Sequence, residues 1–348
     1  MGHIHGGDIY SRKVTHDFSA NINYLGMPDS VKKAAVLAID DAVHYPDPAC
    51  RRVISLLAQK EKTDTRSLIC GNGAADLLYS LCLAFGCRSA AVLCPSFFEY
   101  EQAVTACGGK VKRIFLKEEN GFAPDEETLE EIRAFKPQLL FLGNPNNPTG
   151  RTLPADWIRR VLQIRSEEDL LTVIDESFAG FMTGSDRNRT LEAVRLTGEY
   201  PNLFVLKSFT KLYAIPGIRF GYGICQNKDL LEKMRGRMQP WGVSSVAQAA
   251  ACACCGETEF AERTAAAVAE NRELLKKGLS GLGFHVTEGA AANFLLFSGE
   301  EGLEERLLEK GILIRGCGNF PGLSDKWYRV CVRSREENET LLLALRSR

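Results

Sequence analysis

Between residues 67 and 206, the sequence alternates short apolar runs with longer segments that have the apolar spacing of helices. Strands that are apolar along their whole length and separated by helices are typical of a mostly parallel sheet covered on both faces. The fold class that this pattern predicts is therefore α/β. Strands are predicted at residues 67–70, 90–94, 110–115, 138–142, 170–174 and 203–206.

The character of the sequence differs on either side of this region. The first residues are rich in Gly, Asn and Pro, which favour an extended arm with turns. We predict an arm over residues 1–28 that completes the small domain, a large domain over 29–235 and a smaller α+β domain over 236–348. Further helices are predicted at 29–42, 51–61, 77–85, 229–238, 245–278, 304–310 and 336–345, and further strands at 284–287, 294–297 and 328–333.

The composition argues against several classes of function. The formal net charge is −1, so a basic surface for nucleic acid is not expected. No apolar run reaches the ~20 residues of a membrane helix, and no signal-peptide pattern stands at the start. We therefore expect a cytoplasmic protein with no membrane partner. The 12 cysteines are expected to be reduced and mostly buried, since no ligand set with the spacing of a zinc site accompanies them, and no metal is predicted.

The stretch from Val205 to Gly223 follows the last predicted strand and carries an unusual set of polar groups. A lysine amine, such as that of Lys211, can condense with an aldehyde to form a Schiff base. The hydroxyl of Ser208 and the guanidinium of Arg219 suit an anion such as a phosphate. An aldehyde that carries a phosphate is pyridoxal phosphate. On its own, however, an S-x-x-K pattern is more often an ordinary loop.

Other motifs also follow directly on predicted strands, so they can meet at one edge of the sheet. Small residues in Gly71–Asp76 would expose backbone N–H groups at a helix N-terminus to a phosphate, although such turns are often only turns. Asp175 could pair with a pyridine nitrogen, or simply cap the next segment. Asn147 lies in a Pro/Asn turn and could donate to a phenolic oxygen of the same ring. Phe97 could stack on a ring, or lie in the core.

In combination and in this order, these motifs resemble those of the fold-type I, aspartate-aminotransferase-like enzymes that depend on pyridoxal phosphate. The resemblance covers nearly the whole chain and implies a large domain with a mostly parallel seven-stranded sheet plus a smaller α+β domain. It implies that Lys211 forms the Schiff base and that Asp175 pairs with the pyridine nitrogen. It also implies a homodimer with shared active sites, in which Tyr45 reaches the phosphate of the neighbouring subunit. The remaining cofactor contacts that it implies are a ring contact from Asn147, stacking by Phe97, and phosphate contacts from Gly73, Ala74, Ser208 and Arg219.

Two branches of this family compete. His5–Ile9, Asp17–Asn23 and Ile314–Gly322 resemble the threonine-phosphate decarboxylases of the cobalamin pathway, and so does Phe178, where the aminotransferases usually carry tyrosine. The activity implied is decarboxylation of threonine phosphate to 1-amino-2-propanol phosphate, or of serine phosphate to ethanolamine phosphate. The alternative is a histidinol-phosphate aminotransferase that uses 2-oxoglutarate. Tyr24 and Gly316 depart from the decarboxylase pattern, which usually has Pro and Asp there.

A small phosphorylated amino acid would need cationic groups for its two anions. The resemblance assigns the substrate carboxylate to Arg329. Arg315 and His5, with Arg333 as a weaker candidate, are expected to bind the substrate phosphate. Both Arg315 and Arg333 could instead be ordinary surface arginines. The predicted substrate-binding residues are His5, Asn23, Arg315, Arg329 and Arg333.

Overall fold

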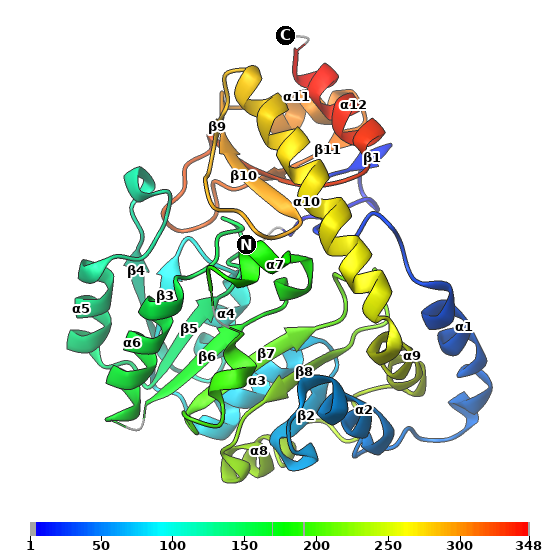
Figure 1. Cartoon of the computed structure of the whole chain (residues 1–348), viewed down its shortest axis with the longest axis vertical. Coiled ribbons are helices and arrows are strands. Elements are labelled where there is room, and N and C mark those ends of the chain that lie inside the picture. Colours follow the sequence, from blue (N-terminus) through cyan, green and yellow to red (C-terminus); the bar gives the residue numbers. More distant parts are fainter. Residues whose placement is uncertain (1–4, 169, 191, 347–348) are drawn as a thin grey trace.

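A seven-stranded sheet organises the larger part of the computed structural model, which describes residues 5–168, 170–190 and 192–346 (Figure 1). Residues 1–4 of the predicted arm therefore lie outside the described part. The strands lie side by side in the order β2-β8-β7-β6-β5-β3-β4. Their bounds are β2 Leu68–Gly71, β3 Ser89–Cys94, β4 Lys110–Phe115, β5 Leu139–Gly143, β6 Leu171–Asp175, β7 Leu203–Ser208 and β8 Gly221–Ile224.

Only β8 runs against the direction of the other strands in this sheet, pairing antiparallel with both β2 and β7. The remaining neighbours pair in parallel, which confirms the predicted α/β fold with a mostly parallel sheet of seven strands. A parallel sheet brings the carboxyl ends of its strands to one edge. The segments that follow β2, β3, β5, β6 and β7 are the ones that carry the unusual motifs, so they begin at this common edge.

Helices cover both faces of the sheet because successive strand residues point to opposite faces and are apolar on each. Val173 and Phe204 face one buried cluster, while their neighbours Ile174 and Val205 face the other. The first cluster also holds residues of α3 (Ala74–Phe85), α4 (Phe98–Ala106) and α8 (Lys228–Arg235). The second holds residues of α2 (Arg51–Glu61), α5 (Glu126–Phe135) and α6 (Ala155–Ser166).

A second, smaller sheet is antiparallel and follows in the C-terminal part of the chain, with the order β12-β13-β10-β9. Near it, the N-terminal strand β1 (His16–Asp17) pairs in parallel with β11 (Ile312–Leu313). The helix α10 (Thr258–Gly281) extends from the large sheet to the small one (Figure 1). The other bounds are β9 His285–Val286, β10 Phe294–Ser298, β12 Arg315–Gly316, β13 Trp327–Cys331, α11 Leu303–Glu309 and α12 Arg335–Arg346.

The long helix predicted at 245–278 is divided in the structure into α9 (Ser245–Gly256) and α10, with Glu257 between them. α9 packs against α1 (Asp29–Leu37) and α2, beside the large sheet, although it follows the predicted boundary at residue 235. The predicted helix at 29–42 is likewise divided, into α1 and a short 3-10 helix, Asp40–Val43. The bounds of the three predicted domains stay predictions.

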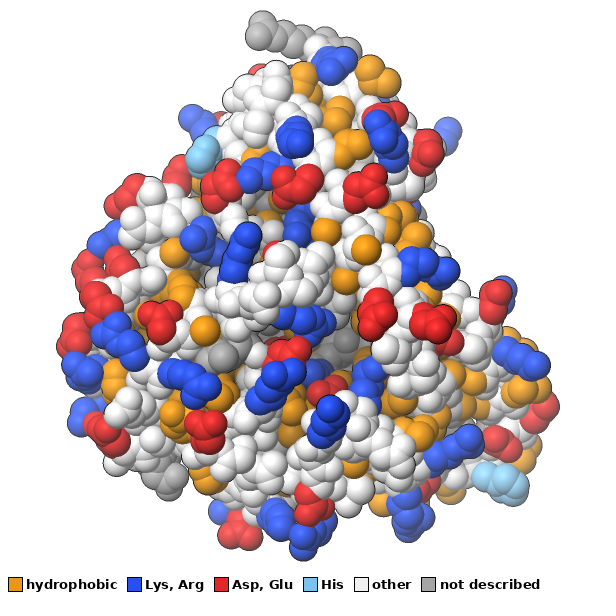
Figure 2. All heavy atoms as spheres, viewed as in Figure 1, with side chains coloured by type: hydrophobic (Ala, Val, Ile, Leu, Met, Phe, Trp, Pro, Cys, Tyr) orange, Lys and Arg blue, Asp and Glu red, His pale blue; other side chains and the backbone are white. Residues whose placement is uncertain are grey.

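The described surface mixes acidic and basic side chains, and Figure 2 shows both signs interspersed on one face. No helix among the described residues is long and apolar enough to cross a membrane. All 12 cysteines are free thiols, and most are buried. In the described part of the chain, no three His, Cys, Asp or Glu side chains lie together as ligands for a metal ion.

Candidate active site

A cavity of about 600 Å³ opens at the carboxyl edge of the large sheet. Its walls come from the N-terminal segment, the first turn of α3, the loops after β3 and β5, the ends of β6 and β7, and the strands β12 and β13. Segments far apart in the sequence therefore converge on one hollow between the two sheets. Ten of the predicted site residues line it: His5, Ala74, Phe97, Asn147, Asp175, Ser208, Lys211, Arg219, Arg315 and Arg329.

Lys211 lies in the turn after β7, where its amine is held by a chain of hydroxyls. Its Nζ donates to Thr210 Oγ1 at 2.8 Å, and Thr210 Oγ1 lies 2.7 Å from Ser208 Oγ. Burial, together with the nearby charge of Arg219, lowers the pKa of Lys211 to about 8. A neutral amine is the form that attacks an aldehyde, so this setting makes the nucleophile accessible near neutral pH.

The first turn of α3 forms a cradle with the guanidinium of Arg219. Gly73 precedes this 12-residue helix with a φ of +84°, and a Cβ there would lie 2.5 Å from Arg219 Nη2. A glycine is also needed at position 221 because of a close approach, since a Cβ there would lie 2.5 Å from the backbone N of Ala74. The helix N-terminus, the guanidinium and the Ser208 hydroxyl are the donors that a phosphate requires. The residues present therefore fit a phosphate-bearing aldehyde.

Asp175 ends β6 and presents a buried carboxylate to the cavity. Each of its oxygens accepts one hydrogen bond: Oδ1 from the backbone N–H of Ser177 at 2.8 Å, and Oδ2 from the hydroxyl of Tyr100 at 2.8 Å. Hydrogen bonds to the charged form favour an ionised carboxylate. Tyr100 was not predicted as a site residue. The sequence places it one helical turn after Phe97, but nothing in that spacing shows which strand end it faces.

Asn147 and Arg329 are joined directly across the cavity. Arg329 Nη1 donates to Asn147 Oδ1, and Arg329 Nη2 donates to the carbonyl of Ser19 at 2.8 Å. Because the amide oxygen of Asn147 is engaged in this way, a ring oxygen would have to accept from the NH2 group. Burial lowers the pKa of Arg329 to about 10, and this value still leaves the guanidinium charged at neutral pH.

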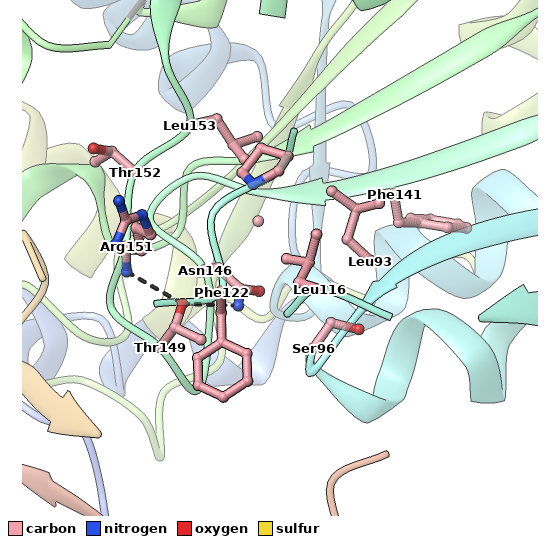
Figure 3. Close-up of a pocket in the computed structure, with 12 residues that line it drawn as sticks. Leu93, Ser96, Leu116, Phe122, Phe141, Asn146, Thr149, Arg151, Thr152 and Leu153 are labelled. Carbon is pink, nitrogen blue, oxygen red and sulfur yellow. Dashed lines mark hydrogen bonds between the residues drawn. The ribbon is translucent and has the colours of Figure 1, made fainter. Parts of the chain in front are cut away.

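The loop that carries Asn147 is fixed by hydrogen bonds of its neighbours (Figure 3). Asn146 Nδ2 donates to the carbonyl of Pro95 at 3.0 Å and to Thr149 Oγ1 at 3.0 Å. The backbone N–H of Arg151 also donates to Thr149 Oγ1, at 3.3 Å. The loops after β3 and β5 are thereby tied together, and Asn147 is held on a rigid turn.

Further positive charge comes from the small sheet and the N-terminal segment. Arg315 is buried, donates to Asn319 Oδ1 at 2.9 Å, and lies 5.4 Å from the ring centroid of Phe320. His5 Nε2 lies 3.5 Å from Glu99 Oε1. Burial, and then the charges of Arg315 and Arg329, lower the pKa of His5. Two arginines and a histidine thus face the same cavity as Lys211.

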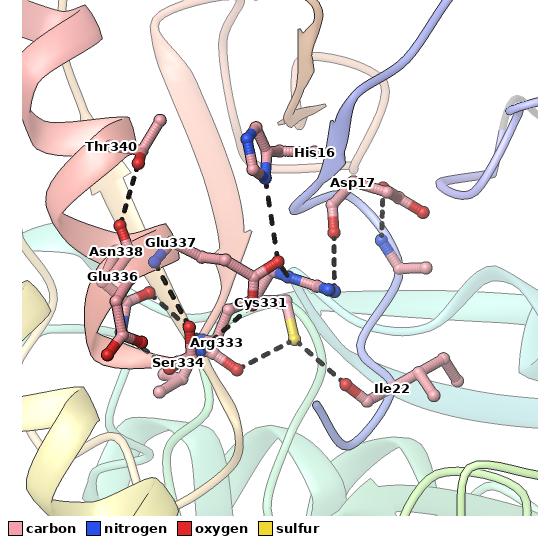
Figure 4. Close-up of polar contacts among 12 residues, drawn as sticks. His16, Asp17, Ile22, Cys331, Arg333, Ser334, Glu336, Glu337, Asn338 and Thr340 are labelled. Atoms are coloured by element: carbon pink, nitrogen blue, oxygen red, sulfur yellow. Dashed lines mark hydrogen bonds and ion pairs between the residues drawn. The ribbon is translucent and has the colours of Figure 1, made fainter. Parts of the chain in front are cut away.

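Two predicted substrate residues do not line this cavity. Asn23 is buried, and its Nδ2 donates to the carbonyl of Leu212 at 2.7 Å and to Thr264 Oγ1 at 3.1 Å. Arg333 donates to Glu337 Oε1 at 2.7 Å and to the carbonyl of Asp17 at 3.1 Å (Figure 4). Both side chains therefore have contacts within the chain, and Arg333 fastens the N-terminal segment to the small sheet. Their predicted contact with substrate stays a prediction.

Tyr45 is also outside the residues that line the cavity. Its side chain is exposed, and its ring stacks on that of Trp241 with a centroid distance of 4.5 Å. A residue that reaches into a neighbouring subunit would have to be exposed in a single chain. The predicted role of Tyr45 therefore stays a prediction.

The fold and the cavity together define an enzyme of fold type I that depends on pyridoxal phosphate. The defining features are the large mostly parallel sheet, the lysine that follows its penultimate strand in sequence, the phosphate cradle and the aspartate at a strand end. A model of the family described as aminotransferase class I and II matches residues 14–345, and the chain belongs to that family. Enzymes of this family use pyridoxal 5'-phosphate, which is therefore the cofactor of this chain.

Individual relatives fall into both branches considered above. The chain is 33% identical to the threonine-phosphate decarboxylase of Salmonella typhimurium, over 95% of this chain and 90% of the relative. It superposes on the histidinol-phosphate aminotransferase of Clostridium acetobutylicum with a TM-score of 0.87 and 30% identity, covering 95% and 98% of the two chains. For the L-threonine-O-3-phosphate decarboxylase of Porphyromonas gingivalis the TM-score is 0.79 at 26% identity, with 94% and 97% covered.

Proposed function

We propose that this enzyme decarboxylates L-threonine O-3-phosphate to (R)-1-amino-2-propanol O-2-phosphate, with L-serine O-phosphate as a possible second substrate. The observation that carries the proposal is the pair of buried arginines, Arg315 and Arg329, in the cavity that holds Lys211. Two separate guanidinium groups suit a substrate with two anions, a carboxylate and a phosphate. The likeness to the Salmonella typhimurium decarboxylase supports this choice, and we propose a place in the cobalamin pathway on the same ground.

In this proposal the chain's own residues divide the work. Bound pyridoxal phosphate supplies an aldehyde for the substrate amine and a ring that accepts the electron pair left when a bond at the α-carbon breaks. Arg329 binds the substrate carboxylate, while Arg315 and His5 bind the substrate phosphate. Anchoring both anions fixes the rotation about the bond between the substrate nitrogen and the α-carbon. This rotation decides which of the other bonds of the α-carbon is broken. Asp175 presents its carboxylate to the ring nitrogen.

Lys211 is the proposed acid at the α-carbon, where it returns a proton. A group whose pKa lies near the working pH transfers protons most effectively in both directions. The pKa of Lys211, lowered to about 8 by burial, meets this condition. Once carbon dioxide has left, the ammonium form of Lys211 returns a proton to the α-carbon of the product.

The second candidate function is that of a histidinol-phosphate aminotransferase. The superposition with a TM-score of 0.87 on the Clostridium acetobutylicum enzyme favours it. In that case Lys211 would move a proton at the α-carbon without loss of the carboxylate, and 2-oxoglutarate would accept the amino group. The two candidates share the lysine, the aspartate and the phosphate cradle, so only the products distinguish them.

Carbon dioxide release tests the proposal. The purified enzyme with pyridoxal phosphate and phosphothreonine is expected to release carbon dioxide without any 2-oxo acid present. Free threonine should react at least about 100-fold more slowly, because the buried cations would be left without their phosphate partner. Amino transfer to 2-oxoglutarate, with no release of carbon dioxide, would instead identify the aminotransferase.

We further propose that the enzyme is a homodimer with shared active sites. Apolar side chains are exposed on and beside α1, and orange side chains reach the surface on that side in Figure 2. An exposed patch of several apolar side chains is typical of a protein interface. The residues that form this patch are Val36, Leu37, Ile39, Val43, Tyr45 and Trp241.

The patch gives a prediction about assembly. Leu37→Glu places a charge at the centre of the proposed interface and is expected to shift the protein from dimer to monomer, as measured by light scattering during gel filtration. Leu343→Glu is the matched control, because Leu343 is similarly exposed (61%, against 59% for Leu37) but lies on α12. A wild-type monomer, or equal effects of the two substitutions, would contradict the proposed interface.

A further inference from the structure

The carboxylate of Asp175 depends on a residue that no motif indicated. Tyr100 donates its hydroxyl to Asp175 Oδ2 at 2.8 Å, and this hydrogen bond is buried. The other oxygen accepts from the backbone of Ser177. One donor on each oxygen restrains the rotation of the carboxylate and leaves the remaining lone pairs for a partner in the cavity.

The ring of Tyr100 is held firmly in place. It stacks on Phe141 of β5 with a centroid distance of 5.2 Å and an interplanar angle of 8°. It also makes an edge contact with Phe97, at 5.6 Å and 78°. Burial raises the pKa of Tyr100 well above its ordinary value, and the Asp175 carboxylate contributes to this, so the phenol is a donor at neutral pH. Aromatic packing thus aims a donor at Asp175.

We propose that Tyr100 is a positioning residue, whose hydroxyl holds the Asp175 carboxylate in the orientation that faces the ring nitrogen of the cofactor. This inference rests on the proposed role of Asp175. Phe97 and Tyr100 lie within one turn at the start of α4, so a single short segment sets both the face of the cofactor ring and the charge at its nitrogen. A purely structural role would be limited to the stability of the fold.

Tyr100→Phe tests this role because it keeps the ring and its packing and removes only the hydroxyl. We expect the dissociation constant of pyridoxal phosphate, measured by titrating the apo-protein, to rise about 10-fold, in line with a lost hydrogen bond to a charged group. The visible absorbance of the bound cofactor changes with pH, and the pH at the midpoint of this change should rise by about 0.5 to 1 unit. The midpoint rises because an Asp175 carboxylate that is held less firmly gives less stabilisation to the protonated ring nitrogen.

Tyr222→Phe is the matched control. It also removes a buried phenol, which donates to Glu61 Oε1 at 2.6 Å on the opposite side of β7. This variant should lose stability without moving the dissociation constant or the midpoint. If Tyr100→Phe behaves in the same way, the proposed positioning role is overturned.

A double substitution separates positioning from folding. In the Asp175→Asn background, the further change Tyr100→Phe should leave the midpoint unmoved, because the carboxylate that the hydroxyl serves is gone. Equal shifts in both backgrounds would overturn the proposal. These measurements need no substrate, so they stand or fail separately from the release of carbon dioxide from phosphothreonine.

Discussion

Lys211→Ala is expected to abolish the visible absorbance that pyridoxal phosphate acquires when it is bound to the lysine. Turnover should fall by roughly 10⁴-fold or more, because the nucleophile and the proton-transfer group are lost together. Borohydride reduction followed by mass spectrometry measures the covalent link directly. The wild-type protein should gain the mass of the reduced cofactor on the peptide that contains Lys211, and the variant should not.

The fold should survive this substitution. Because burial lowers the pKa of Lys211 from 10.5 to about 8, the folded apo-protein carries an unfavourable ammonium at pH 7. That cost is fully present below pH 8, shrinks as the pH rises, and vanishes above the ordinary pKa of 10.5. It amounts to at most about 3 kcal/mol.

Lys211→Met, which keeps the length of the side chain, should therefore make the apo-protein at least as stable as the wild type at pH 7. The difference in the free energy of unfolding should narrow between pH 8 and pH 10.5. Denaturant unfolding at several pH values measures it. An unfolded variant, or one that keeps its absorbance band, would contradict the assignment of Lys211.

The second large effect is expected at Arg329. Arg329→Lys keeps a positive charge but loses the planar fork that donates to Asn147 and to the carbonyl of Ser19. Truncating one partner of a buried, hydrogen-bonded charge pair costs about 2–5 kcal/mol, so kcat/KM for phosphothreonine should fall by roughly 30- to 4,000-fold. Steady-state kinetics should show most of this loss in KM if Arg329 binds the carboxylate in the ground state.

Arg333→Lys is the matched control for this prediction. Arg333 lies just beyond the same strand, β13, but donates to Glu337 and to the carbonyl of Asp17. Its substitution should lower thermal stability and leave KM within about 3-fold of the wild type. A larger effect on KM from Arg333→Lys than from Arg329→Lys would reverse the two roles.

The large sheet could be predicted because its central parallel strands are mostly apolar and are followed by unusual residues. Knowing that the carboxyl ends of parallel strands share an edge was enough to expect Asp175 and Lys211 in one place. β8 could not be predicted, since Gly221 and Gly223 weaken a strand signal. The structure shows that Gly221 is required by the close approach of Ala74, a contact between segments far apart in the sequence.

The place of the residues that directly follow a strand could be predicted from the fold, whereas His5, Arg315 and Arg329 were expected only from the substrate's charges and the family resemblance. The contact of Arg333 with Asp17 could not be predicted, because Asp17 is 316 residues away and the pairing of β1 with β11 that brings them together leaves no local pattern. The contact of Asn23 with Thr264 could not be predicted for the same reason, since these residues are 241 positions apart. Tyr100 was missed because its hydroxyl meets Asp175 only through the order of the strands in the sheet.

Nuclear magnetic resonance of phosphothreonine incubated with the enzyme in D₂O tests the central claim most directly. Decarboxylation followed by proton return from Lys211 predicts a new phosphorus signal, that of 1-amino-2-propanol phosphate, and one solvent deuterium at the former α-carbon. No 2-oxo acid should be needed. Unchanged phosphothreonine, or its conversion to a 2-oxo acid only when 2-oxoglutarate is added, would contradict the proposed decarboxylase.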